Sequence, residues 1–505
     1  PDPDVAFTLS EAEEDSEEGK DPTDNPTENP TENPTDNPTE KPTENPTDDP
    51  TEPPKKDVVY EYAPAADPNP EQQATKPTLS TSATPAAETR EATQANAPAA
   101  APTTPTAPAA DPPVEGSAEN PTKNVIRVIN NWAEKVLKIR LSNVNIKVDD
   151  TSRYADGTRE QFNSMSYGVS AAEVQGTGKT KIELDGQNVL DSSTSEYGAG
   201  LRKKDSGNLT ITDETSDTGE TITAKDETDT SGSLRAEGGE VGKAAAIGGN
   251  SGQATDNITI EGYATVKANT LGHDGAGIGG GNGAKGSNIT IQGHANVTAN
   301  GGWSGAGIGG GSRGNDGGGD AENITIQDYA KVTATAHDGT AIGSGSAQYS
   351  VWGDQEKSGV AKNIVIRGHA IVNAKNDGSG AAIGAAWGDN AEVTIGTAGA
   401  TAEQENVHVT ATASYGAAIG NGAKDTKVTI QGHVTIQTAL DTASVAIGSR
   451  CGNVTVNIKD NASINTATGR SNSSIGGWKI DSDSGRKVVV NIAVGGVVKV
   501  KLGQK

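Results

Sequence analysis

Short strings of alternating apolar and polar residues recur through the second half of the chain. One reads Asn257-Ile-Thr-Ile-Glu-Gly-Tyr-Ala-Thr-Val-Lys-Ala, and copies begin at Asn288, Asn323 and Asn363. Alternate residues of a β-strand face the same side, so Ile258 and Ile260 can point inward while Thr259 faces water. The period of two and the many β-branched residues exclude a helical repeat. Each string therefore predicts two short strands.

A second, glycine-rich string alternates with the first and predicts a third strand. Its isoleucines are separated by 28 to 41 residues, which is the period of a solenoid. Weaker copies at Tyr167 and Gly198 indicate that the repeat begins near residue 125. The isoleucines are Ile247, Ile278, Ile308, Ile342, Ile383, Ile419, Ile447 and Ile475.

One repeat of three strands cannot bury its apolar side alone. Stacking places each strand about 4.8 Å above its copy in a parallel ladder, which buries a narrow Ile/Val/Ala core. Connections between parallel strands are right-handed as a rule. We therefore predict an all-β fold, a right-handed parallel β-helix of about ten coils. It spans residues 165–505, preceded by an N-terminal cap and first coil at 123–164 that contains Trp132.

The first part of the chain has a different texture. Residues 21–52 repeat a Pro-Thr-acid-Asn unit, and residues 63–120 are rich in Ala, Pro and Thr. Proline at every fourth position prevents helices and interior strands, and like charges extend the chain. We expect residues 1–122 to be a long disordered stalk that holds the β-helix away from a surface. A solvated tail or linker is the alternative.

The composition and charge of the chain exclude several classes of binding partner. The formal charge is −26, and residues 1–54 hold 18 acidic against 2 basic side chains. Clustered Lys and Arg are absent, so nucleic acid is not an expected partner. No apolar run is long enough for membrane insertion. The single Cys451 excludes a disulfide framework and a cysteine zinc site.

The start of the chain also bears on its location. It opens at Pro1 without a charged and then apolar leader, so we expect a mature chain whose targeting signals have been removed. With the scarcity of cysteine and the stalk, this favours an extracellular location, at the cell surface or in the cell wall.

A column of rings is the first candidate site. The residues align at the turn between the second and third strands, where ring faces could form a flat surface for sugars. The alternative is that the rings stack on one another and only cover the corner. The column consists of Tyr263, His294, Tyr329, His369 and His433.

The asparagine that opens each string should fall at one turn and form a stacked amide ladder. This is a structural prediction. The ladder would contain Asn208, Asn257, Asn288, Asn323, Asn363 and Asn453.

Tryptophans lie in or beside the variable loops, where they could anchor a ligand or pack a loop onto the helix. They include Trp303, Trp352 and Trp387. The longest insertion, residues 344–362, also contains Tyr349, Asp354 and Glu356, and we predict a binding site there.

Two acidic pairs, Asp316 with Asp320 and Asp354 with Glu356, could bind Ca²⁺ or act as glycosidase carboxylates. No other cofactor is expected. The Gly-x-Gly-x-x-Gly strings at Gly275 and Gly305 are not a dinucleotide site, because they repeat and no helix follows. Their glycines serve tight turns and close approach of coils.

The GAGIGGG and NITIxGxAxVxA strings give residues 165–500 a resemblance to glycine-rich right-handed parallel β-helix surface proteins of Gram-positive anaerobes. They also resemble a calcium-dependent carbohydrate-binding family of the pectate-lyase-like superfamily. Lyases of that superfamily place aspartates and a catalytic arginine or lysine on one outer sheet. Arg367 is the only basic residue at its strand position beside an imidazole, and no aspartate cluster faces it in sequence.

The resemblance implies a cell-surface adhesin or carbohydrate-binding β-helix, held on an extended stalk, whose partner is a polysaccharide, a host glycan or a host protein. Binding rather than catalysis is the predicted role. A polysaccharide lyase or glycoside hydrolase is one alternative, and a purely structural surface spacer is another.

Overall fold

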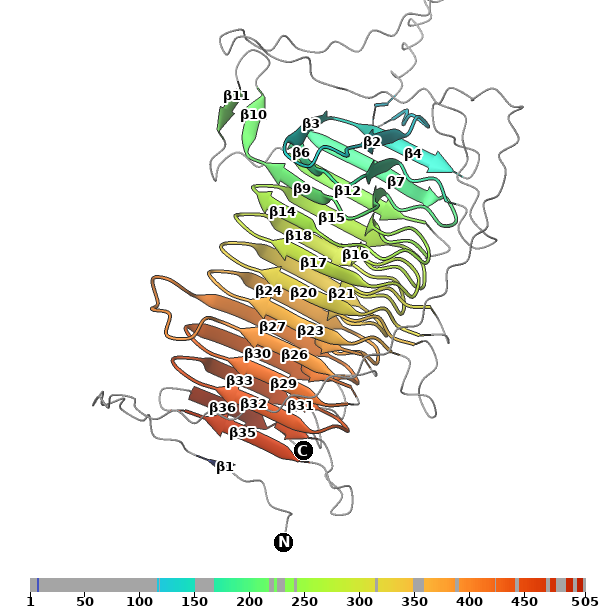
Figure 1. Ribbon diagram of the computed structural model, residues 1–505. Coiled ribbons are helices and arrows are strands. Elements are labelled where there is room, and N and C mark those ends of the chain that lie inside the picture. The colour runs from blue at the N-terminus through green and yellow to red at the C-terminus, as the bar shows by residue number, and fades with distance from the viewer. Residues whose placement is uncertain are drawn as a thin grey trace, which may run out of the picture. The chain divides into compact units, whose positions relative to one another are not determined.

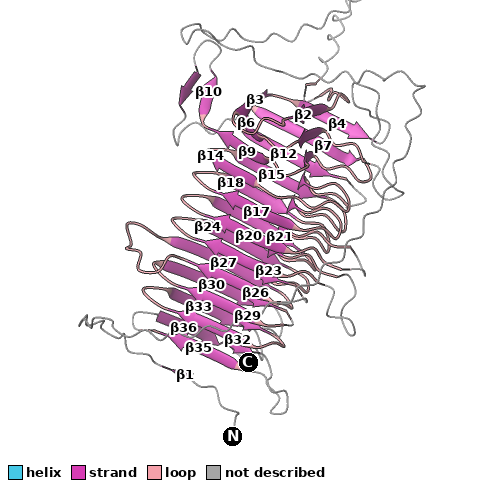
Figure 2. Ribbon diagram, in the orientation of Figure 1, coloured by secondary structure: helices cyan, strands magenta, loops and turns pink. Residues whose placement is uncertain are grey.

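The computed structural model describes residues 7–8, 116–117, 119–149, 168–217, 222–224, 232–239, 243–313, 317–347, 358–386, 390–422, 424–440, 445–468, 473–477, 487–493 and 497–502. The predicted stalk lies outside these residues, except for 7–8, 116–117 and 119–122. The described residues contain no helix, so they include no candidate for a helical membrane span (Figure 2).

Three parallel sheets wind around a common core in eleven coils, and each coil contributes one strand to sheet C, then to sheet A, then to sheet B (Figure 1). Sheet C contains β2 (Ile126–Ile129), β5 (Ala172–Gln175), β8 (Leu201–Lys203), β13 (Ile247–Gly248), β16 (Ile278–Gly279), β19 (Ile308–Gly309), β22 (Ile342–Gly343), β25 (Ile383–Ala385), β28 (Ile419–Asn421), β31 (Val445–Ser449) and β34 (Ser473–Gly477).

Sheet A contains β3 (Val136–Ser142), β6 (Lys179–Asp185), β9 (Asn208–Asp213), β14 (Ile258–Gly262), β17 (Gly286–Ile291), β20 (Ala321–Ile326), β23 (Ala361–Ile366), β26 (Ala391–Ile395), β29 (Thr426–Ile430), β32 (Val454–Ile458) and β35 (Val488–Ile492), and β1 (Phe7–Thr8) pairs with β35. Sheet B contains β4 (Asn145–Asp149), β7 (Gln187–Thr194), β12 (Ser233–Gly238), β15 (Thr265–Thr270), β18 (Asn296–Asn300), β21 (Lys331–Ala336), β24 (Ile371–Asn376), β27 (Val407–Ala413), β30 (Val434–Leu440), β33 (Ser463–Thr468) and β36 (Val497–Leu502).

Like residues stack directly over one another, which confirms the predicted parallel β-helix. Ile258 pairs with Ile289, Ile289 with Ile324 and Ile324 with Ile364, and all four side chains are fully buried. The intervening threonines face outward and are half-buried. The alternation read from the sequence therefore gives the inner and outer sides of sheet A. The first coil, β2 to β4, lies within the segment predicted as cap and first coil.

A column of glycines follows the isoleucines of sheet C. Gly248, Gly279, Gly309 and Gly343 have φ between +132° and +142°, which non-glycine residues rarely adopt. A Cβ atom on Gly279 would lie 1.9 Å from the carbonyl oxygen of Gly309 in the next coil. These glycines are therefore required for the close approach of coils, as predicted.

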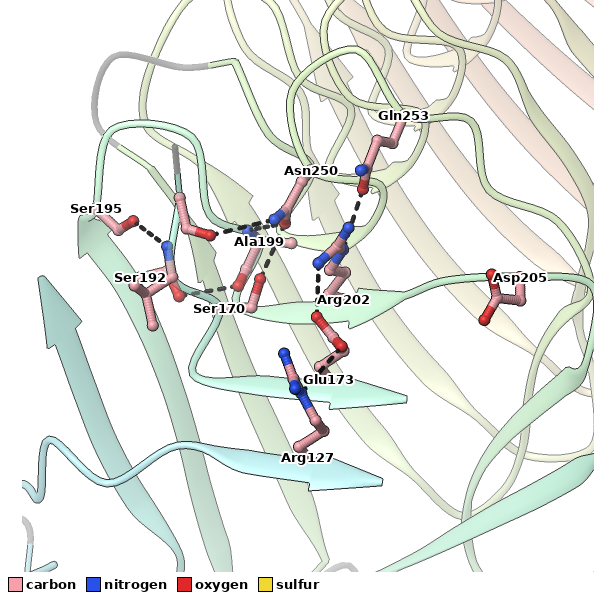
Figure 3. Close-up of polar contacts among 12 residues, drawn as sticks. Arg127, Ser170, Glu173, Ser192, Ser195, Ala199, Arg202, Asp205, Asn250 and Gln253 are labelled. Carbon is pink, nitrogen blue, oxygen red and sulfur yellow. Dashed lines mark hydrogen bonds and ion pairs between the residues drawn. The ribbon is translucent and has the colours of Figure 1, made fainter. Parts of the chain in front are cut away.

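In the first three coils, ionic side chains occupy the column that glycine takes later. Arg127, Glu173 and Arg202 are in register, one per coil, and Arg202 is followed by Gly248. Nη1 of Arg202 donates to Glu173 across 2.6 Å, and Nε donates to Gln253 across 3.0 Å, with both ions almost fully buried (Figure 3). Nε of Arg127 lies 3.4 Å from the same carboxylate. The network therefore links ionic side chains of three successive coils on sheet C.

An asparagine ladder forms at the entry to sheet A. Asn288 donates to Asn257, Asn323 to Asn288 and Asn363 to Asn323, across 2.8 to 3.0 Å. All four have φ between +51° and +56°, a conformation that asparagine tolerates better than most residues. The predicted ladder is thus confirmed for four of its six residues.

The prediction was wrong for Asn208 and Asn453. The ladder starts with Nδ2 of Asn257 donating to the carbonyl of Ser206, and Asn453 donates to Asp425 instead. Beyond Asn363 the pairing of β23 with β26 shifts register, because the later coil is one residue shorter between its paired alanine and the next paired residue. The column of left-handed asparagines therefore ends there.

Two long insertions interrupt the turn between sheets A and B. One leaves β9 and carries the hairpin β10 (Thr215–Asp217) and β11 (Ile222–Ala224). The other, residues 396–406, joins β26 to β27. Both project from the same side of the β-helix (Figure 1). Between them lie four coils whose corresponding turns are short.

Candidate functional site

The turn from sheet A to sheet B stacks four rings in those coils. The ring centroids of Tyr263 and His294, His294 and Tyr329, and Tyr329 and His369 are 4.9, 4.9 and 4.7 Å apart, with interplanar angles of 14°, 2° and 15°. Tyr329 is 51% exposed, and the other three are half-buried. The stack therefore remains in contact with solvent along its length.

The local sequence explains why the rings line up. The residue before each ring has φ between +59° and +76°, and it is Gly262, Gly293, Asp328 or Gly368. The amide of each later ring residue then donates to the carbonyl of that turn residue in the coil before, as from His294 to Gly262 across 2.8 Å. The backbone thus sets the register, and the rings stack within it.

His433 does not extend the stack. In the strand register it lies two coils beyond His369, and Asn406 occupies the same place in the intervening coil. Its Nε2 instead lies 3.1 Å from Nδ2 of Asn461. The prediction of a five-ring column is corrected to four rings, because the coil of β27 has an amide where a ring was needed.

The stack presents ring edges to solvent. Each inner ring has another ring against both faces at less than 5 Å, so those faces are occupied. Phenol hydroxyls and imidazole nitrogens lie at the edges, and they donate and accept hydrogen bonds. A platform of open ring faces was one of the two predicted arrangements, and the observed geometry is the mutual stacking that was the other.

Polar columns on the outer side of sheet A continue beside the rings. Gln292 donates to Glu261 across 2.7 Å, Gln327 donates to Gln292 across 2.8 Å, and Arg367 donates to Gln327 across 2.6 and 2.9 Å. A second column holds Thr259, Thr290, Thr325 and Val365 in register. We call these two columns with the four-ring stack the panel.

Two charges at the panel are tied to neighbours. Glu261 lies 3.5 Å from Lys181, and Arg367 is bound to Gln327. At the edge of sheet A, the hydrogen bond from Lys285 holds the pKa of the Glu322 carboxyl below its ordinary value, and Lys362 lies 3.5 Å from that carboxyl. The columns in the middle of the panel therefore consist of hydroxyl, amide and ring groups, and the adjacent turn carboxylate of Asp328 accepts from the amide of Gly293 across 3.1 Å.

Trp303 lies on a different edge, at the turn from sheet B to sheet C. Its ring centroid is 3.9 Å from that of His337 and 6.4 Å from that of His273, tilted by 54° and 45°. Nε1 donates to Asp338 across 2.8 Å, and Nδ1 of His337 is 2.7 Å from Asp377. Trp303 is still 47% exposed. We call these five residues the indole corner.

The sequence holds a signal for this corner that the prediction missed. His273, Trp303 and His337 each lie five residues before the isoleucine of the following sheet C strand. If residues are numbered back from the isoleucine of each repeat, the three rings fall at the same position, which predicts that they lie next to one another in successive coils.

Polar groups are buried beneath the indole corner. Asp274, only 8% exposed, accepts a hydrogen bond from Asn282 through Oδ2 across 2.8 Å. Its Oδ1 and the hydroxyl of Ser304 are buried and have no hydrogen-bond partner among the described residues. Burial raises the pKa of the Asp274 carboxyl, while Asn282, His273 and Lys243 act in the opposite direction.

Several predicted residues fall outside the described part of the chain. They are Tyr349, Trp352, Asp354 and Glu356 of the long insertion, with Asp316 and Trp387. Of the four predicted Ca²⁺ ligands only Asp320 is described, and its Oδ1 accepts from the amide of Val360 across 2.8 Å. No group of three or more His, Cys, Asp or Glu side chains in the described ranges could hold a metal ion.

The lyase assignment for Arg367 gains no support from its surroundings. Its guanidinium is occupied with Gln327, as described above, and the neighbouring residues of the column are amides rather than aspartates. The chain matches no family model, no curated protein and no solved structure, so the fold and these two surfaces are what its function must be argued from.

Proposed function

We propose that the protein is a carbohydrate-binding β-helix of the cell surface, and that a linear, uncharged stretch of polysaccharide lies along the panel parallel to the helix axis. The observation that carries this proposal is a row of outward polar groups and a ring that recurs over four consecutive coils, with the full set of threonine, amide and ring in the two middle coils. A polymer of like sugars offers similar hydroxyl groups at regular intervals, so a repeating surface can bind it through many weak, equivalent contacts.

The chemistry of the panel is suited to hydroxyl groups. Each glutamine in the column donates one N–H to the coil before and accepts through its carbonyl oxygen from the coil after, which leaves its second N–H for a ligand. Tyrosine and imidazole edges add donors and acceptors next to apolar ring carbon, which fits the mixed surface of a sugar. The two projecting insertions bracket the same four coils and limit the length of a bound segment. The proline-rich part of the sequence would supply reach from the cell wall.

The test is binding of the purified protein to immobilised plant, bacterial and mucin polysaccharides. Tyr329→Ala should weaken binding by about tenfold, because it removes a central ring edge and unstacks its two neighbours. His433→Ala is the matched control, since this ring occupies the same turn outside the stack. It should leave binding unchanged.

The same experiment separates the alternatives. New reducing ends or unsaturated products would favour a hydrolase or a lyase. Absence of binding to every polysaccharide would favour a structural spacer. Equal loss of binding in Tyr329→Ala and His433→Ala would exclude the panel as the site.

A further inference from the structure

The indole corner carries chemistry that the panel lacks. Its rings are hydrogen-bonded to two carboxylates, Asp338 and Asp377, whereas the turn carboxylate in the middle of the panel, Asp328, accepts from the backbone amide of Gly293. It is also built from the opposite turn of the coil, after sheet B rather than before it. A ligand of the corner therefore need not be a ligand of the panel.

We propose that the indole corner is a second binding site, and that it takes an alkylated ammonium group. A cation is attracted to the electron-rich face of an aromatic ring, and tryptophan is the strongest of the natural partners. The two imidazoles are tilted to Trp303 by 45° and 54°, so neither lies flat against the indole as the stacked panel rings lie against one another, and Trp303 is 47% exposed.

The carboxylates strengthen this site in two ways. Asp338 accepts the Nε1 hydrogen of Trp303, which polarises the N–H bond toward the carboxylate and increases electron density on the indole. The same contact fixes the orientation of the ring before a ligand arrives. Asp338 is held in turn by the hydroxyl of Ser379 across 2.8 Å.

Asp377 supplies a negative charge that solvent can reach. It is exposed, and because an ionised carboxylate only accepts hydrogen bonds, Nδ1 of His337 is the donor to it. Apolar surface is also available, since Leu271, two residues before His273, is 57% exposed. A ring face, apolar carbon and carboxylates match an ammonium ion that carries methyl groups.

An alkylated ammonium is favoured over a simple one by hydration. Methyl groups spread the charge and weaken the water shell, so less hydration is lost when the ion rests on an exposed ring. A neutral sugar would use the ring face but not the two carboxylate charges. The charge on the ligand is thus the property that distinguishes this site.

The test uses choline and tetramethylammonium as ligands of the whole protein, measured by titration calorimetry. Binding in roughly the millimolar range is expected for one exposed cation–π site. The uncharged isostere 3,3-dimethylbutanol and glucose are the controls, and both should bind at least about tenfold more weakly. Comparable binding of the isostere or of glucose overturns the proposal, as does the absence of choline binding.

Variants locate the site. Trp303→Leu should abolish choline binding and Asp377→Asn should weaken it severalfold, while Trp303→Phe should retain part of it. Tyr329→Ala should bind choline as the unaltered protein does, so failure of this proposal and failure of the panel are distinguishable. Thermal unfolding of each variant checks that the fold is kept. If Trp303→Leu unfolds at the unaltered temperature and still binds choline, the indole corner is not the site.

Discussion

Individual glycines determine how closely adjacent coils approach one another. The glycines after the sheet C isoleucines combine a positive φ with backbone contact to the coil above, whereas other glycines have the first property alone. Gly279 and Gly252 represent the two cases, since a Cβ atom on Gly252 would meet nothing within 4 Å. Sequence alone marks both positions as glycine and cannot separate the two cases, because the difference lies in a neighbouring coil.

Gly279→Ala should destabilise the protein on the order of 3 kcal/mol or more, because the new methyl group collides with the carbonyl of Gly309. Gly252→Ala, with φ of +72° but open space, should cost only about 1 kcal/mol. Urea unfolding of both variants measures the difference. Equal losses would show that φ, rather than contact between coils, limits these positions.

Asp274 is a buried acid whose proton is bound more tightly in the folded protein than in the unfolded chain, because burial raises its pKa. Its contribution to stability is therefore present at acid pH and is lost as the pH rises through the folded pKa. Asp274→Asn should remove this loss. The unfolding temperature of the variant relative to the unaltered protein should rise as the pH increases above about 4, the ordinary pKa of an aspartate carboxyl. If the difference in unfolding temperature between Asp274→Asn and the unaltered protein does not change with pH, this role of Asp274 is contradicted.

Strands stay in register where the turns between them have equal length. The asparagine ladder shows what could be predicted from the sequence and what could not. The strand strings and the ladder positions at Asn257, Asn288, Asn323 and Asn363 followed from alternation and spacing. The break after Asn363 did not, because a difference of one residue changes the pairing without changing the apolar pattern. Likewise the ring stack ends where Asn406 takes the place of a ring. Aligning the histidines by their local sequence alone did not show that a coil without a ring lies between His369 and His433.

Asn323 lies in the middle of this ladder and tests its contribution. Asn323→Ala should cost about 2 kcal/mol, from the left-handed backbone and the loss of hydrogen bonds to Asn288 and Asn363. Asn323→Gly should cost less, because glycine adopts φ of +56° without strain. Chemical denaturation compares the two. If glycine is as destabilising as alanine, the hydrogen bonds rather than the backbone dominate.

The described part of the molecule is a stack of coils, and the number and stacking of the coils were predicted better than any local feature. About ten coils were expected and eleven are present. The indole corner was not predicted, since its five residues come from four successive loops, and the positions of its three rings match only when they are counted back from the next sheet C strand. The buried Arg202 and Glu173 pair was missed for a related reason: charged residues stand in a column that is glycine everywhere further along.

Removal of one entire coil should therefore be tolerated. Deletion of residues 279–308 joins Ile278 to Gly309 and keeps the strand register, because Ile278 pairs with Ile308. The shortened protein should fold with an unchanged β-type circular dichroism spectrum. The denaturant dependence of its unfolding free energy should be lower by roughly a tenth, in proportion to the surface removed. Deletion of residues 279–293 is the control, and it should prevent folding because it removes β17 and places the sheet B strand β18 directly after a sheet C strand, where a sheet A strand is required.

The ladders of backbone hydrogen bonds run along the axis of the winding, which has a mechanical consequence. Tension applied along that axis loads the hydrogen bonds between adjacent coils in sequence. The coils therefore separate one after another, and no whole sheet is sheared at once. A tether attached at the two ends should lengthen in steps of roughly 100 Å, the contour of one turn of about thirty residues, at modest force. Such a body would yield gradually under load and re-form from the turns that remain.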